Sequence, residues 1–196
     1  MSPADQATSP RERLLAGAIE HVSQHGVGEI SLRQLAAALG TSHRMLLYHF
    51  GSREALLIEV IRTVEEQQRA ALALILEQET GAPPADIMRR MWARVADEAL
   101  WPNERLFFEV YAQALQGSPH AQPLLDGIVD LWVEPLVRIA VARGEDEARA
   151  RAEARLGIAV VRGLLLDLLA TEDREAVDAA MERYIEAIAP GSAYGS

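Results

Sequence analysis

Residues 31–52 read SLRQLAAALGTSHRMLLYHFGS, and this stretch decides the fold. Ser31 with Gln34 three positions later forms a capping box, which predicts the start of a short helix. Gly40 ends that helix, and one or two residues later a second helical stretch runs from Ser42 to His49. Two short helices around a glycine-centred turn predict a helix-turn-helix, whose second helix can enter the major groove of DNA.

The two short helices carry residues suited to packing against each other. Ala36 lies four residues before Gly40, and its small side chain permits a close approach between the helices. Leu35, Leu39 and Leu46 fall on the faces that would meet. Glycine at the turn lets the backbone leave the right-handed helical region at low cost.

Helical signals continue on both sides of this stretch. Ser9-Pro10-Arg11-Glu12 is a second capping box, and it predicts a first helix that Gly26 and Gly28 close. Ser52 is expected to cap a long fourth helix that runs to about Glu79. Five further helices are expected, at about Ala85–Leu100 (stopping at Trp101-Pro102), Asn103–Gln116, Ser118–Gly144, Asp146–Ala170 and Asp173–Ala189.

The predicted fold class is therefore all-α. A three-helix DNA-binding domain with a helix-turn-helix occupies residues 1–54, of which 1–9 form a flexible arm. A six-helix domain follows at 55–190, and 191–196 form a flexible tail.

Composition and charge narrow the class of protein. The net charge is -10, but the five arginines and five acids of residues 1–55 cancel, so this part is the least repelled by phosphate. The chain has no cysteine, which excludes disulfides and thiolate metal sites. No apolar run of 18 residues predicts a membrane span, and the polar start MSPADQATSP does not resemble a signal peptide. A cytoplasmic protein is expected.

The segment from Ser31 to Leu56 resembles the DNA-binding signature of TetR-type regulators. Residues 48–54, YHFGSRE, are especially close to the family's usual YHFxSKE segment. The resemblance covers residues ~10–60, and the rest of the chain matches only in helix count and length. It implies a sequence-specific transcriptional regulator, typically a homodimeric repressor that a small molecule releases from an inverted-repeat operator in double-stranded DNA.

The resemblance also implies which residues contact DNA. Arg33 would meet the groove or phosphate, residues 43–45 would read bases, and Arg53 would meet phosphate in place of the family's lysine. Tyr48 and His49 would touch the backbone or adjacent bases, although the Tyr48 ring could instead cover the core. The full set is Arg33, Thr41, Ser42, His43, Arg44, Met45, Leu47, Tyr48, His49 and Arg53.

Two of these positions depart from the family pattern, and two neighbours are expected in the core. Leu47 stands where a phosphate-bonding tyrosine is usual, and Arg44 stands where a small residue or proline is common. Arginine can bond bidentately to guanine, so an operator with a guanine contact in each half-site is expected. Leu46 and Phe50 are expected in the core, and Met45 could lie there too.

Aromatic residues concentrate in the second domain. They could be core filling, or they could line a ligand pocket, which is what the resemblance favours. The candidate ligand-binding residues are Met88, Trp92, Trp101, Phe108, Tyr111, Trp132 and Arg162. Because most of them are apolar, a hydrophobic or aromatic effector is expected. Glu65 and Glu66 are expected on a solvated helix face.

The final helices predict self-association. Residues 156–169 are apolar nearly all round, and a helix of that kind is buried on more than one side. In the family, the last two helices form a four-helix bundle with those of a partner copy. Gly157 and Gly163 would permit a close approach there.

An alternative class is an all-helical carrier or enzyme for hydrophobic molecules that lacks specific DNA binding. Motifs of common enzymes, such as GxSxG, HExxH and the P-loop, are absent from the sequence, so no catalytic residue and no cofactor are expected. His21 and His25 have a spacing that could bind a metal, but the sequence offers no third ligand, so no metal site is expected.

Overall fold

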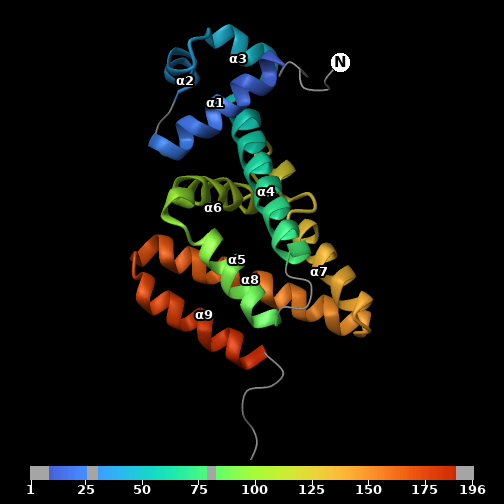
Figure 1. Cartoon of the computed structure of the whole chain (residues 1–196). Helices are drawn as coiled ribbons and strands as arrows, with labels where there is room; N and C mark the ends of the chain where they lie inside the picture. The colour runs from blue at the N-terminus through green and yellow to red at the C-terminus, as the bar shows by residue number, and fades with distance from the viewer. Residues whose placement is uncertain (1–8, 26–30, 79–82, 189–196) are drawn as a thin grey trace, which may run out of the picture. The chain divides into compact units, whose positions relative to one another are not determined.

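The computed structural model describes residues 9–25, 31–78 and 83–188, and this part of the chain is all-helical, as predicted. The expected arm up to residue 8, the helix end at Gly26 and Gly28, and the tail 191–196 lie outside the described residues. The helices are α1 (Pro10–His25), α2 (Leu32–Ala38), α3 (His43–Phe50), α4 (Arg53–Gln78), α5 (Pro84–Val95), α6 (Trp101–Leu115), α7 (Asp130–Ala142), α8 (Glu147–Thr171) and α9 (Arg174–Ile188) (Figure 1).

The predicted helix starts at Ser9, Ser31 and Ser52 are confirmed by side-chain caps. The Ser9 backbone N–H donates to Glu12 Oε2 (2.7 Å) and the Glu12 N–H donates to Ser9 Oγ (3.2 Å). Hydrogen bonding of the Glu12 carboxylate to the Ser9 backbone N–H, and then to the Ser9 side chain, holds the pKa of Glu12 below its usual value, because it stabilises the ionised form. Ser31 and Gln34 form the same reciprocal box, and Ser52 Oγ accepts from the Ala55 N–H.

Two predicted helix boundaries are wrong. Trp101-Pro102 does not stop a helix: α5 ends at Val95, a short 3-10 helix covers Glu98–Leu100, and Trp101 begins α6. A proline in the first turn suits a helix start, because the N–H that it lacks has no partner within the helix. Ser118-Pro119 likewise lies in a turn, and the next long helix, α7, begins only at Asp130.

The chain divides into two compact units. The first contains the residues up to Glu66 together with Ala99–Leu124, and the second contains Gln67–Glu98 and the residues from Leu125 onward. Helix α4 contributes residues to both units. Of the described residues, no helix is both long and apolar enough to cross a membrane.

In the first unit, α1, α2 and α3 pack around a small core. Ala18 and Val22 of α1, Leu35 of α2, and Leu46 and Phe50 of α3 are all buried. Gly17 makes a close approach possible, because a Cβ there would come within 2.7 Å of Leu39 Cδ2. The absence of a side chain on α1 therefore lets the end of α2 pack against it.

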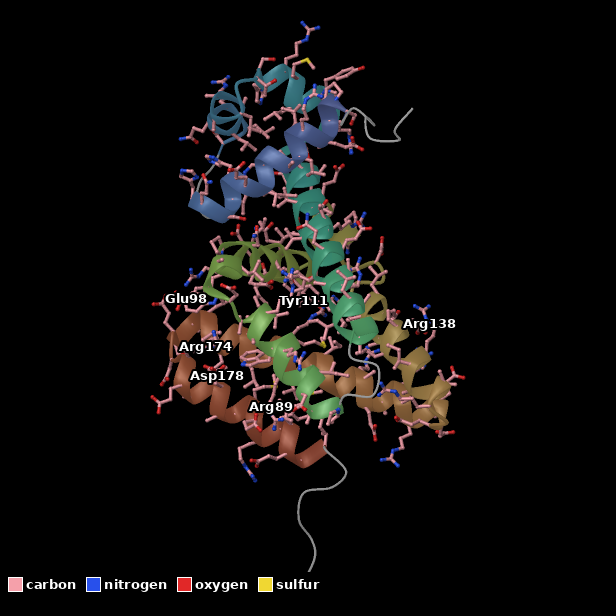
Figure 2. The ribbon with its side chains drawn as sticks, in the orientation of Figure 1. Arg89, Glu98, Tyr111, Arg138, Arg174 and Asp178 are labelled. Atoms are coloured by element: carbon pink, nitrogen blue, oxygen red, sulfur yellow. The ribbon has the colours of Figure 1, made fainter. Side chains whose placement is uncertain are left out.

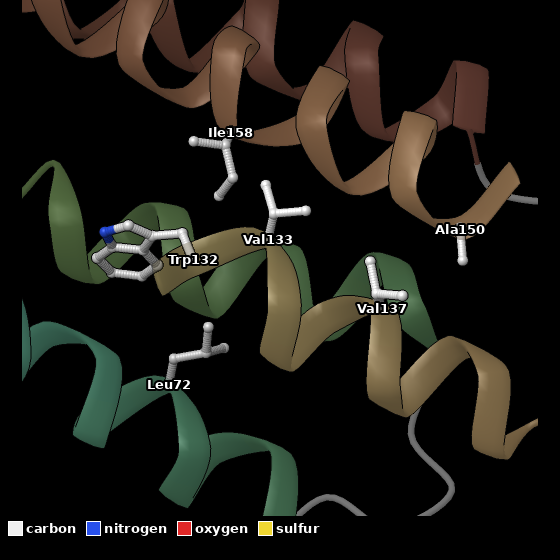
Figure 3. Packing of buried hydrophobic residues seen from close by; sticks show 6 residues of the cluster. All are labelled: Leu72, Trp132, Val133, Val137, Ala150 and Ile158. Atoms are coloured by element: carbon white, nitrogen blue, oxygen red, sulfur yellow. The ribbon is translucent and has the colours of Figure 1, made fainter. Parts of the chain in front are cut away.

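The second unit is centred on α7 and α8. Figure 3 shows part of its core, in which Val133 of α7 faces Ile158 of α8 and Val137 of α7 faces Ala150 of α8. Trp132 of α7 lies toward Leu72 of α4, and these six residues are the buried part of this cluster. Helix α9 returns antiparallel along α8 and also packs on α5 (Figure 1).

Candidate nucleic-acid interface

The turn between α2 and α3 has the geometry that a helix-turn-helix requires. After α2, Gly40 adopts a left-handed conformation (φ 63°), which glycine does without a steric penalty. The Gly40 N–H donates to Ala37 O (3.2 Å) and the Thr41 N–H donates to Ala36 O (2.9 Å). This pair of bonds is a Schellman motif, and it ends α2 sharply. Ser42 then caps α3 by accepting from the Met45 N–H.

Helix α3 has one buried face and one exposed face. Leu46 is fully buried and Phe50 nearly so, as predicted, and they hold the helix on the core of the first unit. Tyr48 is 79% exposed, and Met45 and Leu47 are 41% and 38% exposed. Arg44 is also exposed and lies one turn before Tyr48, so the outer face offers a guanidinium beside a phenol ring.

Arg11 of α1 anchors the C-terminal end of α3. Its Nε donates to His49 O (3.3 Å), and its guanidinium pairs with Glu59 of α4 and lies 5.1 Å from the centre of the Phe50 ring. One side chain thus joins α1, α3 and α4. Sequence reasoning assigned Arg11 only to a helix start, because its contacts are with residues 38 and 48 positions away.

The remaining candidate DNA contacts lie around this face. Arg33 on α2 and Ser42 before α3 are exposed, whereas Thr41, His43, His49 and Arg53 are half-buried. His49 differs from the others, because its Nε2 is buried and has no hydrogen-bond partner. The exposed part of the surface therefore centres on Arg44 and Tyr48.

Comparison with known proteins agrees with this geometry. Residues 14–60 match the family model described as "Bacterial regulatory proteins, tetR family". Residues 14–60 therefore have the sequence of a TetR-family DNA-binding domain. The chain is 28% identical over 183 residues to the HTH-type transcriptional regulatory protein RaaS of Mycobacterium tuberculosis, a match that covers 88% of this chain and 77% of RaaS.

Two solved structures extend the likeness to nearly the whole length of the chain. A transcriptional regulator from Rhodococcus sp. Rha1 is 22% identical with a TM-score of 0.74, over 92% of this chain and 96% of that one. The multidrug binding protein EbrR, solved in complex with imidazole, is 25% identical with a TM-score of 0.60, over 97% of this chain and 98% of that one. Both contain the same helical fold.

The candidate ligand-binding residues are divided between the two units. Met88, Trp92, Trp132 and Arg162 belong to the second unit, and Trp101, Phe108 and Tyr111 belong to the first. Trp92 and Trp132 are buried, and the other five residues are half-buried.

In the second unit, three of these residues have contacts within the protein. Trp92 Nε1 donates to Asp178 Oδ1 (2.6 Å), and Asp178 also accepts from Arg174 Nε one turn earlier on α9 (Figure 2). Trp132 lies in the core cluster, with the Arg69 guanidinium 6.0 Å from the centre of its ring. Arg162 donates to Ile128 O (3.0 Å).

In the first unit, α6 contributes an aromatic cluster. Tyr111 stacks on Phe107 at 5.4 Å between ring centres, and Phe108 meets the edge of Phe107 at 5.3 Å. Arg105 lies 5.6 Å from the centre of the Trp101 ring. These rings pack among themselves within one helix, so core filling accounts for part of the aromatic content.

A small cavity in the first unit involves residues that the sequence did not single out. It is lined by Val60, Ile61, Val64, Glu65, Asn103, Glu104, Leu106 and Phe107. The expectation that Glu65 lies on a solvated face is wrong, since it is 9% exposed, whereas Glu66 is exposed as expected. Position 65 falls on the inner face of α4 together with Ile61 and Val64, a helical spacing that could have indicated its burial.

Proposed function

We propose that this TetR-family regulator is a homodimeric repressor whose α3 reads an inverted-repeat operator and which a small, largely apolar ligand releases. The DNA-binding part of the proposal is supported by one observation. The short helix α3, which Ser42 caps, exposes Met45, Leu47 and Tyr48 beside Arg44. Large apolar side chains grouped on a surface mark an interaction site. A helix of this size fits the major groove, where the thymine methyl group offers an apolar contact and guanine accepts from arginine.

The ten candidate residues take different roles in this proposal. His43, Arg44 and Met45 contact base edges, and Tyr48 spans bases and backbone. Arg33 and Arg53 bond to phosphates, which sets the register of the helix without reading sequence. Thr41 and Ser42 approach the phosphate at the start of α3, where exposed N–H groups favour an anion. Leu47 and His49 are the least polar contacts, because Leu47 lacks a donor and His49 Nε2 is turned inward.

Selection of random duplexes with the purified full chain tests this proposal directly. Enriched sequences should contain an inverted repeat with half-sites about one helical turn, or a multiple, apart. Tyr48→Ala should weaken binding of the selected duplex, whereas Arg138→Ala, an exposed arginine on α7, should not. Enrichment of no sequence at low ionic strength would contradict DNA recognition by α3.

The dimer part of the proposal rests on an exposed face of α8. On α8, the exposed residues Ala152, Leu156, Ala159, Gly163, Leu166 and Ala170 follow one another at spacings of four and three. That spacing gives a single apolar stripe along the helix, as in helices that pair with another helix. Leu156 and Leu166 are 53% and 51% exposed in one chain, which is unusual for leucines on a continuous stripe. We infer that a second copy covers this stripe.

The remaining part of the proposal is that a ligand releases the repressor from its operator. The similarity of this chain to a multidrug binding protein supports this part. The candidate residues are Met88, Trp92, Trp101, Phe108, Tyr111, Trp132 and Arg162, and α4 connects the two units that contain them. A ligand shifts the equilibrium between two states only by its difference in affinity for them, typically about 1–3 kcal/mol. Fluorescence anisotropy of the selected duplex, with a panel of apolar and aromatic compounds, tests this. If no compound changes operator affinity, ligand release is wrong.

A further inference from the structure

Arg11 of α1 contacts the last turn of α3 in two ways. Its Nε donates to His49 O (3.3 Å), and its guanidinium lies 5.1 Å from the centre of the Phe50 ring. Helix α3 has only eight residues and ends at Gly51, whose φ is 78°. The carbonyl groups of a last turn have no partner within their own helix, so a cationic donor from another element stabilises that end. Arg11 therefore supports the end of α3 opposite to the Ser42 cap.

The charge of Arg11 is matched inside the protein. Its Nη2 forms an ion pair with Glu59 Oε1 on α4, and the side chains of Arg11 and Glu59 are 46% and 29% exposed. A partly exposed ion pair of this kind adds little to stability. Its geometric effect is larger, because the guanidinium is a rigid planar group that bonds to α3 and α4 at the same time. The pair thus fixes the side chain that supports α3.

The supported turn also contains Tyr48, whose side chain is 79% exposed. Tyr48 immediately precedes His49, the residue whose carbonyl oxygen accepts from Arg11. A displacement of this turn would therefore move the phenol ring as well. Contacts with base edges depend on hydrogen-bond distances, so even a small displacement would weaken them.

We propose that Arg11 is a positioning residue for operator recognition: together with Glu59 it holds the last turn of α3, and with it Tyr48, in the orientation that DNA binding requires. The inference rests on the proposed recognition of DNA by α3. In this role Arg11 contacts neither base nor phosphate, and it acts through its bonds within the first unit.

Amide hydrogen exchange of the full chain, followed by NMR without DNA, tests the contact itself. The Gly51 N–H donates to Leu47 O (2.8 Å) in the last turn of α3, and the Met45 N–H donates to Ser42 Oγ at the other end. In Arg11→Gln, the Gly51 N–H should exchange several times faster, because local opening of that turn becomes easier, and the Met45 N–H should exchange as in the parent. Unchanged exchange at Gly51, or equal acceleration at both ends, would contradict local support of this turn.

The sign of a charge effect separates positioning from general attraction to DNA. Glu59→Gln removes a negative charge, which by itself should strengthen binding to a polyanion. If Glu59 instead holds Arg11 in place, the same change should weaken binding of the selected operator by about tenfold. Glu66→Gln is the matched control, because Glu66 is exposed on the same helix, and it should not weaken binding. Stronger or unchanged binding in Glu59→Gln would overturn the proposed role of the pair.

The salt dependence of binding separates positioning from a direct phosphate contact. Arg11→Gln should weaken operator binding by about tenfold and leave the slope of log affinity against log salt unchanged. Loss of a phosphate contact would instead lower that slope by about 1. A lowered slope, or an unchanged affinity, would overturn the positioning role and leave DNA recognition by α3 intact. If Arg11→Gln fails to fold, Glu59→Gln, which keeps Arg11, decides the question.

Discussion

Asn103 on α6 donates a hydrogen bond from its side-chain amide to the Ser23 hydroxyl on α1, at 2.8 Å. The two residues are 80 positions apart, and both helices belong to the first unit. Helix α6 contacts α1 at several points. The helix-turn-helix domain is therefore joined to α6 by a part-buried polar bond.

Replacing Ser23 by alanine should destabilise the chain by about 1–3 kcal/mol, because it leaves a buried amide N–H of Asn103 without its acceptor. Urea unfolding followed by circular dichroism measures this. Gln24→Ala is the matched control, since Gln24 is exposed on the same helix and bonds only to Glu20 one turn earlier, and its cost should stay within about 0.5 kcal/mol. Equal costs for the two substitutions would show that the Ser23 bond adds nothing to stability.

Local signals in the sequence predicted the DNA-binding helices well. A capping residue and its partner lie only three positions apart, so Ser31 with Gln34 marks a helix start whatever the rest of the chain does. The burial of Leu46 and Phe50 and the exposure of Arg44 follow in the same way from the period of one short helix.

Features that depend on distant residues could not be predicted in this way. Trp101-Pro102 can stop one helix or start the next, and the choice depends on where α6 packs. Glu65 looked like its exposed neighbour Glu66, because charge alone does not tell which side of α4 meets α6. The anchoring of α3 by Arg11 likewise requires contacts with residues far along the chain.

Replacing Arg44 by alanine should relax base preference at one position of each half-site. A bidentate contact from arginine to guanine is worth about 1–3 kcal/mol of discrimination, and alanine cannot replace it. Competitive binding of all single-base variants of the selected operator measures this. Arg53→Ala provides the contrast: it should weaken binding to all duplexes equally and lower the slope of log affinity against log salt by about 1. An unchanged preference in Arg44→Ala would refute the guanine contact.

Introducing a charge at Leu166 should dissociate the proposed dimer. The side chain is 51% exposed in one chain, so Leu166→Glu need not disturb the fold of that chain. Burying an unpaired carboxylate between two copies would cost several kcal/mol, which raises the dimer dissociation constant by more than about a hundredfold. Sedimentation velocity measures the change, and Leu131→Glu on α7, where the leucine is 48% exposed, is the control. Should both variants sediment alike, the stripe on α8 does not hold the dimer.

Removal of Asp178 should separate the effect of a hydrogen bond from that of an ion pair. Asp178→Ala leaves the buried Trp92 N–H without its acceptor, at a cost of about 1–3 kcal/mol. Asp178→Asn keeps an acceptor oxygen and loses only the half-exposed pair with Arg174, which should cost no more than about 1 kcal/mol. Urea unfolding of both variants measures the difference. A larger cost for asparagine than for alanine would reverse this interpretation.

The Arg89–Glu182 pair should make the free energy of unfolding decrease at acidic pH. Arg89 of α5 donates to both carboxylate oxygens of Glu182 on α9, which holds the pKa of Glu182 below the ordinary 4.5. A carboxyl with a lowered pKa in the folded state stabilises the fold above its unfolded pKa, and that contribution is lost as pH falls through the folded value. Arg89→Gln should therefore raise the pKa of Glu182 toward 4.5, as measured by NMR titration of the side-chain carboxyl carbon. Arg138→Gln on α7 should leave that pKa unchanged, and an equal rise in both variants would indicate a general charge effect instead of this pair.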